Sequence, residues 1–358
     1  MTNIEKFKEF YSKEKNALET EINHFHETFI QENNPMVRDN LERFKNINSE
    51  GKRIRGILVL LGYYLETGET AYSIPLAMAY EIFQTAILVH DDVIDKDEKR
   101  RGKPTIHYEN MKNYQKFSNS KEEVTHLGNS IGICMGDYGL YTANQVIAKS
   151  YEQDKNLGKI LQYFNDTVLK TIKGELLDVV LPFESKYKNI KQDVLEDSIF
   201  NIYRLKTAYY TIIGPIGGGL LLAGASAKQM DDITSFGEKV GIAFQIQDDL
   251  LAIYSNEMGK VNGSDIREFK QTILYSHVST TSYKDQLLKY YGSNSVTSET
   301  IKEVQRILEE SGSKKYAEDK MNELYDSSIQ ELQNITWIKE EKKQILMGLV
   351  EYLKTRKK

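Results

Sequence analysis

The clearest element of the sequence is the stretch from residue 74 to residue 102, which reads IPLAMAYEIFQTAILVHDDVIDKDEKRRG. Apolar side chains dominate it as far as Val89, Pro75 suits a first helical turn, and the polar run that closes at Gly102 marks the exit. The stretch predicts a helix over 74–97. Because this helix is apolar on nearly all sides, we expect it to be buried and to end in a cluster of charge.

Three carboxylates, Asp91, Asp92 and Asp95, make up that charged end. Residues four apart lie on one helix face, so Asp91 and Asp95 project side by side, with Asp92 beside them. Carboxylates this close repel one another unless a cation is present. Their oxygens suit Mg²⁺, which keeps several waters and is completed by substrate phosphates. The alternative is a solvated acidic helix end, which the adjoining apolar run disfavours.

A second acidic pair, Asp248 and Asp249, stands near the end of another mostly apolar helix, in FQIQDDLLAIY. Two aspartate clusters of this kind suggest facing walls of one cavity, with metal ions between them. Basic residues complement them, and arginine can bind a phosphate with two parallel hydrogen bonds. These basic residues are Lys52, Arg53, Arg55, Arg100, Arg101, Lys206, Lys260 and Lys270. Each cluster alone could be a solvated surface, but beside the aspartates they indicate a site for magnesium, diphosphate and a hydrocarbon.

Composition excludes several other classes of protein. The 358 residues are 40% hydrophobic and 28% charged, as in ordinary soluble domains. The net charge of −5 supplies no positive field for nucleic acid or an anionic membrane. A single cysteine, Cys134, excludes an internal disulfide framework and favours a reducing compartment, with the cytoplasm as the default. The first residues lack the apolar run of a signal peptide.

Five prolines and helical rather than alternating spacing predict an all-α fold. Helices are expected at 4–30, 52–65, 74–97, 127–149, 157–180, 193–213, 216–225 and 227–254, and in several segments from 298 to 354. Residues 112–123 and 276–298 are expected to be loops. The uncharged stretch 207–227 approaches the length of a membrane span, but Pro215 and three consecutive glycines disfavour one. No stretch is typical of an interdomain linker, so a single domain over 1–358 is expected.

Eight blocks of sequence resemble the trans-isoprenyl diphosphate synthases, in that family's order. They are GKRIRG (51–56), EIFQTAILVHDDVID (81–95), RRGKPTIH (100–107), MGDYGL (135–140), KGELLD (173–178), KTA (206–208), FQIQDDLL (244–251) and GSDIREFKQTIL (263–274). The resemblance implies the class I isoprenoid synthase fold, a helical bundle around a central cavity. It also implies a Mg²⁺-dependent prenyltransferase, usually a homodimer, that condenses isopentenyl diphosphate with an allylic diphosphate into a linear all-trans polyprenyl diphosphate.

The resemblance also implies roles for individual residues. Asp91, Asp95 and Asp248 would bind about three Mg²⁺ ions, supported by Asp92 and Asp249. The allylic diphosphate would rest on these ions and on Arg100, Lys206 and Lys260, while Lys52, Arg55 and Arg101 would bind isopentenyl diphosphate. Further contacts are expected from Gln84, Thr207, Gln245 and Lys270, and the departing diphosphate would take the proton near Lys206, Thr207 and Gln245.

Four residues depart from the family's common pattern. Gln84 replaces a frequent histidine, Glu175 a frequent glutamine and Phe269 a frequent glycine, and Ala252 removes the last carboxylate of the second aspartate motif. Glutamine can donate a hydrogen bond to isopentenyl diphosphate but cannot carry charge. None of the four is an expected direct metal ligand.

Two alternative functions stay open on the sequence. A class I terpene cyclase would ionise a similar diphosphate, but such cyclases lack the GKRIRG and GSDIREFK blocks. A non-catalytic subunit of a heteromeric synthase would be expected to have lost metal ligands, which this chain keeps.

Product length is expected to depend on the helix that carries Asp91. Ala86 is small where short-chain members carry an aromatic ring, so the hydrocarbon could descend past Ala86 and Ile87 to Phe83, one further turn away. We therefore expect geranylgeranyl diphosphate or a somewhat longer product. The alternative is that Phe83 is ordinary core packing.

Overall fold

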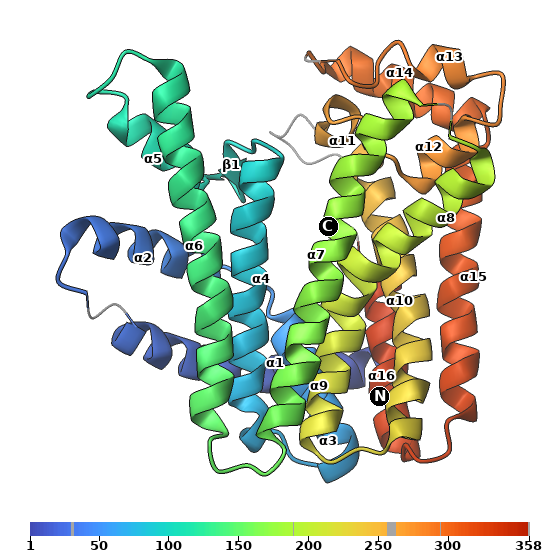
Figure 1. Cartoon of the computed structure of the whole chain (residues 1–358). Helices are drawn as coiled ribbons and strands as arrows, with labels where there is room; N and C mark the ends of the chain where they lie inside the picture. Colours follow the sequence, from blue (N-terminus) through green and yellow to red (C-terminus); the bar gives the residue numbers. More distant parts are fainter. Residues whose placement is uncertain (30–31, 189, 256–262, 294, 357–358) are drawn as a thin grey trace. The chain divides into compact units, whose positions relative to one another are not determined.

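Helices make up nearly all the regular structure of the computed structural model, which describes residues 1–29, 32–188, 190–255, 263–293 and 295–356 (Figure 1). The predicted all-α fold is confirmed. The chain forms two compact units. The amino-terminal unit comprises Tyr11–Gln162 and Gly218–Gly224, and the carboxyl-terminal unit comprises Met1–Phe10, Tyr163–Gly217 and the residues from Ala225 onward.

The elements of the amino-terminal unit are most of α1 (Asn3–Phe29), α2 (Pro35–Asn48), α3 (Ile54–Thr67), η1 (Ala71–Ser73), α4 (Ile74–Ile94), β1 (Lys99–Arg100), β2 (Lys103–Pro104), α5 (Ile106–Tyr114) and α6 (Lys121–Ser150). Those of the carboxyl-terminal unit are most of α7 (Leu157–Tyr187), α8 (Gln192–Ile202), η2 (Tyr203–Ile213), the start of α9 (Gly214–Leu222), α10 (Ala227–Tyr254), α11 (Ser264–Arg267), α12 (Ile273–Val278), α13 (Lys284–Leu287), α14 (Ser298–Glu310), α15 (Ser313–Asn334) and α16 (Glu340–Lys354).

Helix α6 packs closely against α4 because glycines line the side of α6 that faces it. A Cβ atom at Gly136 would lie 2.2 Å from Nε2 of His90, and one at Gly139 would lie 2.8 Å from the Cβ of Ala86. Distances this short leave no room for a larger residue. The close packing gives α4, which ends in the first aspartate cluster, a fixed position within the amino-terminal unit.

The chain reverses just after α4 in a small hairpin of β1 and β2, in which Lys99 pairs with Pro104 and Arg100 with Lys103. Arg101 and Gly102 form the two-residue turn, with φ of 52° and 80°. Positive φ at both central positions is the conformation that two-residue hairpin turns require. The hairpin brings Arg100 back to the end of α4 and Arg101 to the segment that follows α2.

Helix α8 continues into η2, a π-helical segment that carries Lys206 and Thr207. Glycines on both neighbouring helices allow close approach to it. A Cβ at Gly174 of α7 would lie 2.3 Å from the Lys206 backbone nitrogen, and one at Gly241 of α10 would lie 2.4 Å from the Ala208 Cα. The backbone at Lys206–Ala208 is therefore enclosed between α7 and α10. π-helical segments often occur at functional sites.

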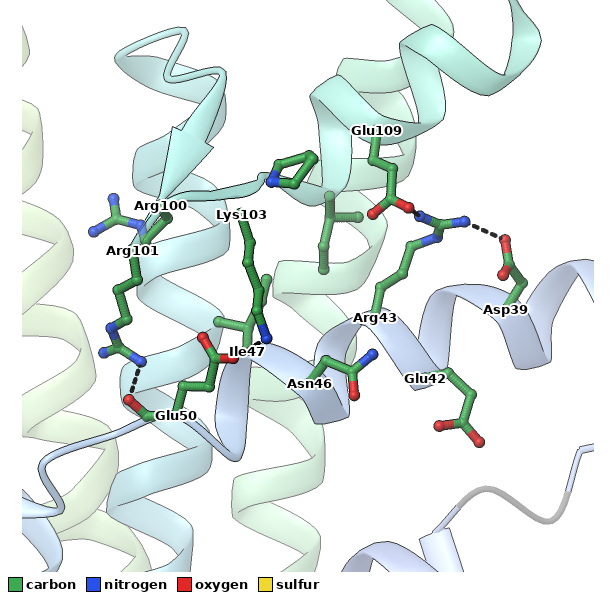
Figure 2. A pocket seen from close by; sticks show the side chains of 12 residues that line it. Asp39, Glu42, Arg43, Asn46, Ile47, Glu50, Arg100, Arg101, Lys103 and Glu109 are labelled. Atoms are coloured by element: carbon green, nitrogen blue, oxygen red, sulfur yellow. Dashed lines mark hydrogen bonds and ion pairs between the residues drawn. The ribbon is translucent and has the colours of Figure 1, made fainter. Parts of the chain in front are cut away.

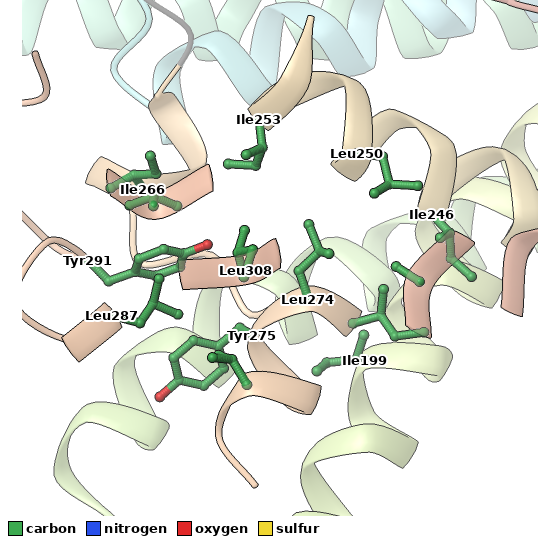
Figure 3. Packing of buried hydrophobic residues seen from close by; sticks show 14 of the residues in the cluster. Ile199, Ile246, Leu250, Ile253, Ile266, Leu274, Tyr275, Leu287, Tyr291 and Leu308 are labelled. Carbon is green, nitrogen blue, oxygen red and sulfur yellow. The ribbon is translucent and has the colours of Figure 1, made fainter. Parts of the chain in front are cut away.

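Buried side chains of α8, α10, α12 and α14 form a hydrophobic cluster in the carboxyl-terminal unit (Figure 3). Ile246, Leu250 and Ile253 of α10 recur at helical spacing and face Leu274 of α12 and Leu308 of α14. This apolar face fixes α10 within the carboxyl-terminal unit.

Several predicted boundaries need correction. Helix α3 begins at Ile54 rather than at residue 52, because Arg53 has a left-handed backbone. The predicted loop 276–298 contains the end of α12 and all of α13. The predicted helix 193–213 is in fact α8 followed by π-helix. Among the described residues, Ala71–Ile94 is the one helical stretch long and apolar enough for a membrane span, and most of it is buried within the protein.

Candidate functional site

The first aspartate cluster lies where α4 ends. The Asp95 N–H still donates to the Asp91 carbonyl at 2.8 Å, so the last helical turn is intact. Asp91 and Asp95 therefore share one face, as their spacing predicts. Arg100 of the hairpin reaches this cluster: its Nη2 donates to Oδ2 of Asp91 at 3.1 Å and its Nε donates to Oδ1 of Asp92 at 2.6 Å.

The two adjacent aspartates differ in exposure. Asp91 keeps 19% of its side chain exposed, whereas that of Asp92 keeps 2%. Burial raises the pKa of Asp92 to about 6, although the Arg100 guanidinium opposes the shift. Oδ2 of Asp92 has no hydrogen-bond partner among the described residues. Asp91 is thus available to a ligand, while Asp92 serves chiefly to bind Arg100.

Arg101 and Lys103 of the hairpin bind the segment after α2. Nη1 of Arg101 donates to the Glu50 carbonyl at 2.5 Å, and Nζ of Lys103 forms an ion pair with the Glu50 carboxylate (Figure 2). Both line a cavity of about 350 Å³ beside α2. At its other end Arg43 lies between Asp39 and Glu109 (Figure 2). Carboxylates therefore match Lys103 and Arg43, whereas Arg101 is held by a backbone carbonyl and keeps its positive charge for an anion.

The three basic residues of GKRIRG differ in exposure. Lys52 is exposed and Arg55 is half-buried, so both can reach a ligand. Arg53 is 1% exposed and is bound by buried or half-buried carboxylates. The sequence grouped Arg53 with the phosphate-binding candidates, and the structure corrects that grouping. Nothing in the local pattern distinguishes Arg53 from its neighbours.

The predicted chain-length residues occupy different surroundings on α4. Phe83 and Ala86 are fully buried, while Gln84 and Ile87 are half-buried. Ala86 faces Gly139 of α6 rather than open space. Its small size is therefore explained by packing between the two helices.

The second aspartate cluster lies on α10, and Asp248 forms an ion pair there with Arg356 near the end of the described chain. The Arg356 guanidinium also lies 4.3 Å from the ring centroid of Phe244. Gln247 holds the same segment, because its Nε2 donates to the carbonyl oxygens of Lys354 at 3.2 Å and Arg356 at 3.1 Å. The sequence did not predict a partner for Asp248 more than one hundred residues away.

Asp249 is buried, unlike Asp248, whose side chain is 38% exposed. The Tyr203 hydroxyl donates to Oδ2 of Asp249, and Nε2 of Gln245 donates to Oδ1 at 2.8 Å. Oε1 of Gln245 accepts from the Thr207 hydroxyl. Burial, with further effects from Asp265 and Asp248, raises the pKa of Asp249 to about 8. The second aspartate of each pair is therefore the buried one, and Tyr203 is a site residue that the sequence did not reveal.

Lys206 lies between two carboxylates of α7, with its Nζ 2.6 Å from Oδ2 of Asp178 and 2.8 Å from Oε2 of Glu175. Glu175, one of the departures from the family pattern, thus places a negative charge beside Lys206. Lys270 lies 3.7 Å from Asp265 and 3.6 Å from Glu268. Lys260 lies outside the described residues.

Phe269, another departure, has a backbone φ of 59°, in the left-handed region where glycine is favoured. Its ring packs against Tyr275 at 5.6 Å and Tyr291 at 6.1 Å between centroids. The aromatic contacts offset the backbone cost and explain how phenylalanine is tolerated.

The chemistry of the donors fits magnesium. Asp91 and Asp248 both present partly exposed carboxylate oxygens, the ligands that Mg²⁺ prefers. Within the described part of the chain, no three His, Cys, Asp or Glu side chains form a protein-only metal centre. A cation completed by water and substrate phosphates is consistent with so few protein ligands.

Comparisons with known proteins identify the family of the chain. A family model for polyprenyl synthetases matches residues 40–308. The chain is 29% identical to the short chain isoprenyl diphosphate synthase of Methanocaldococcus jannaschii over 266 residues, 73% of each chain. It is 28% identical to the geranylfarnesyl diphosphate synthase of Aeropyrum pernix over 320 residues, which cover 87% of this chain and 92% of that one.

A solved structure is also similar. It is geranylgeranyl pyrophosphate synthase from Corynebacterium glutamicum, complexed with isoprenyl diphosphate and magnesium. The TM-score is 0.84 at 25% identity, with 96% of this chain and 98% of that chain covered. These findings confirm the predicted class I fold and the resemblance from which the prenyltransferase activity was predicted. The chain is a member of the polyprenyl synthetase family.

Proposed function

We propose that this protein joins isopentenyl diphosphate head to tail to an allylic diphosphate and so makes a linear all-trans polyprenyl diphosphate, geranylgeranyl or somewhat longer. The observation that carries the proposal is the family match across both aspartate clusters, together with an accessible first aspartate in each. Geranylgeranyl and geranylfarnesyl synthases among the relatives support a product in this range.

In this proposal Asp91, Asp95 and Asp248 bind about three Mg²⁺ ions. Bound Mg²⁺ would supply Lewis-acid neutralisation of the charge that develops on the leaving diphosphate. The chain's own residues bind and orient the substrates: Arg100, Lys206, Lys260 and Lys270 at the allylic diphosphate, and Lys52, Arg55, Gln84 and Arg101 at isopentenyl diphosphate. Fixed cations aimed at developing negative charge stabilise a transition state without reorganising.

After the new carbon–carbon bond has formed, a proton is lost. We place this step near Thr207 and Gln245. Thr207 donates to Gln245, and Gln245 donates to Asp249 at 2.8 Å. A hydroxyl and a neutral amide are both weak bases. This chain of hydrogen bonds orients the Gln245 amide and supports a departing diphosphate as the proton acceptor.

We further propose a single functional domain over 1–358, acting in the cytoplasm as a homodimer. The family match runs through both units of the structure, which supports one functional domain. A row of exposed apolar side chains on α7, including Leu176 and Phe183, supports association with a second copy.

Product analysis tests the proposal and separates it from its alternatives. The purified chain is incubated with Mg²⁺, labelled isopentenyl diphosphate and either dimethylallyl, geranyl or farnesyl diphosphate, and the products are sized. We expect labelled linear products. Unlabelled cyclic products formed without isopentenyl diphosphate would indicate a terpene cyclase, and activity only after adding another subunit would indicate a non-catalytic partner.

A further inference from the structure

The segment between α2 and α3 carries Lys52 and leads into Arg55, two residues proposed to bind isopentenyl diphosphate. Arg53 lies between them in the sequence but is buried, with 1% of the residue exposed. Its backbone is left-handed, with φ of 57°, an uncommon conformation for a residue with a side chain. Such a conformation is strained and persists only where surrounding contacts impose it.

Every nitrogen of the Arg53 guanidinium has a partner. Nε and Nη2 donate to the two carboxylate oxygens of Glu19 on α1 at 2.9 and 3.0 Å. Nη1 donates to the Asn48 carbonyl at 2.5 Å and lies 3.6 Å from Oε2 of Glu81 on α4. The paired bonds to Glu19 use the planar fork that only arginine offers. No part of the guanidinium is left to contact a diphosphate.

Glu81 extends these contacts to the start of α3. Its carboxylate is buried, and its Oε1 accepts from the Gly56 N–H at 2.7 Å. The backbone carbonyl of Glu81 accepts from Nδ2 of Asn48 at 3.0 Å. One carboxylate therefore connects Arg53 to the first turn of α3, directly after Arg55.

Arg101 joins the same segment from the opposite side, through its bond to the Glu50 carbonyl (Figure 2). Gly51 packs closely on Arg53, since a Cβ at position 51 would lie 3.1 Å from Nη1 of Arg53. Residues 50–55 thus connect the three cations proposed for isopentenyl diphosphate. Lys52 and Arg55 belong to this segment, and Arg101 is hydrogen-bonded to it. Arg53 holds the same segment to the protein interior.

We propose that Arg53, bound by Glu19 and Glu81, is a positioning residue that sets the backbone from which Lys52 and Arg55 meet the diphosphate of isopentenyl diphosphate. This inference rests on the proposed function of Lys52 and Arg55. A buried arginine with two carboxylates is weak as a source of stability, because desolvation offsets much of the ion-pair attraction. The contribution of Arg53 is geometric, because its paired hydrogen bonds hold the backbone that carries Lys52 and Arg55.

The test measures binding of isopentenyl diphosphate calorimetrically in the absence of divalent metal, and KM for each substrate and kcat with Mg²⁺. The variants are Arg53→Lys, which keeps the charge and loses the fork, and Glu19→Gln, which keeps the shape and loses one charge. Glu19 is 28% exposed, so its substitution is expected to leave the protein folded. Lys52→Ala is the reference for a direct ligand, and Arg306→Met removes an exposed arginine of α14 as a control.

We expect both Arg53→Lys and Glu19→Gln to raise the Kd and KM for isopentenyl diphosphate by about tenfold, the size of one lost charge-assisted hydrogen bond. KM for the allylic diphosphate and kcat are expected to change little. The thermal midpoint is expected to fall in both variants, because each leaves a buried charge less well paired. Arg306→Met should match the wild type in every measurement.

Two results would overturn the inference. The first is unchanged binding in Arg53→Lys and Glu19→Gln while Lys52→Ala loses it. The second is an equal rise in the KM values for isopentenyl diphosphate and for the allylic diphosphate, which indicates a merely structural role. Failure of the wild type to bind isopentenyl diphosphate, or normal binding by Lys52→Ala, would instead overturn the proposed function and this inference with it.

Discussion

At the scale of single residues, the two aspartate pairs share one arrangement. Asp91 and Asp248 keep part of their carboxylates exposed, whereas Asp92 and Asp249 are buried, with pKa values raised to about 6 and about 8. A group that is neutral over part of the physiological pH range is a poor ligand for a hard cation. The first aspartate of each pair is therefore the one expected to bind metal.

This difference predicts the outcome of substitution within each pair. We expect Asp91→Ala, Asp95→Ala or Asp248→Ala to lower kcat at least about 100-fold, or about 2.7 kcal/mol of barrier, because each removes a metal ligand. Asp249→Asn keeps the shape of the side chain and one of its two acceptor oxygens, and should lower kcat less than about tenfold. Steady-state rates at saturating Mg²⁺ measure both, and near-normal turnover in Asp91→Ala would contradict the two-cluster site.

A buried histidine predicts a dependence of stability on pH. Burial lowers the pKa of His26 below its ordinary value of 6.5, although its bond to Asn48 at 2.9 Å opposes the shift. The unfolded chain therefore takes up the proton first as pH falls. The contribution of His26 to the free energy of unfolding is fully present above pH 6.5. It decreases below pH 6.5, by at most about 1.4 kcal/mol per pH unit, until the pH reaches the pKa of His26 in the folded protein.

Denaturant unfolding across pH 5 to 8 tests this dependence. His26→Gln can still donate a hydrogen bond to Asn48 but does not titrate. This variant should therefore lose less of its free energy of unfolding below about pH 6.5 than the wild type does. His24→Gln replaces an exposed histidine two residues away and serves as the control. Equal pH profiles for the wild type and His26→Gln would show that His26 does not titrate on unfolding.

At the scale of elements, α4 joins the aspartate cluster to the proposed hydrocarbon site. Each added isoprene unit buries five carbons, worth about 3–4 kcal/mol, so elongation continues until a side chain blocks it. If Phe83 is that block, Phe83→Ala should lengthen the product by at least one unit, as read from the sizes of labelled products. An unchanged set of products would place the block on another helix.

The matching substitution at Ala86 has a different expected outcome now that its surroundings are known. The sequence predicts that Ala86→Phe shortens the product towards farnesyl. Because the Ala86 Cβ faces Gly139 of α6, a phenylalanine there would force α4 and α6 apart. Overpacking of this kind typically costs about 1–3 kcal/mol, so we expect a lower thermal midpoint, which scanning calorimetry would detect.

The segment after α16 predicts a change in the magnesium requirement. Arg356 forms an ion pair with Asp248, so a metal ion that binds Asp248 has to displace the guanidinium. Arg356→Ala should therefore lower the Mg²⁺ concentration for half-maximal rate by about threefold to tenfold. Lys354→Ala removes a cation of the same segment that pairs with Asp326 at 3.0 Å and is the control. A raised Mg²⁺ requirement would mean that Arg356 assists substrate binding instead.

At the scale of the whole molecule, exposed apolar residues on α7 predict self-association. They recur at helical spacing and comprise Leu169, Ile172, Leu176, Val179, Val180 and Phe183. Leu176 is 60% exposed and Phe183 is 69% exposed. Water-exposed rows of this kind are uncommon on monomers.

Sedimentation equilibrium tests the proposed homodimer. Leu176→Asp or Phe183→Asp should convert it to a monomer, because each places a charge in an apolar interface and forfeits about 1.5–3 kcal/mol of burial per chain. Val194→Asp introduces the same charge at an exposed position on α8 and should remain dimeric. A monomeric wild type would exclude the homodimer.

The sequence alone determined the all-α class, the order of the motifs and the family, because these depend on periodicity and on blocks of adjacent residues. It also placed Asp91 and Asp95 on one helix face, since four residues make about one helical turn. Such properties are local, and neighbouring residues suffice to specify them.

Only the tertiary structure decided which member of each polar group faces inward. Arg53 pairs with Glu19 across 34 positions, and Arg356 pairs with Asp248 across 108. The packing of Ala86 on Gly139 and the burial of Asp92 and Asp249 likewise depend on contacts between separate helices. Local periodicity carries no record of such pairings, because burial and long-range partners follow from how the helices pack.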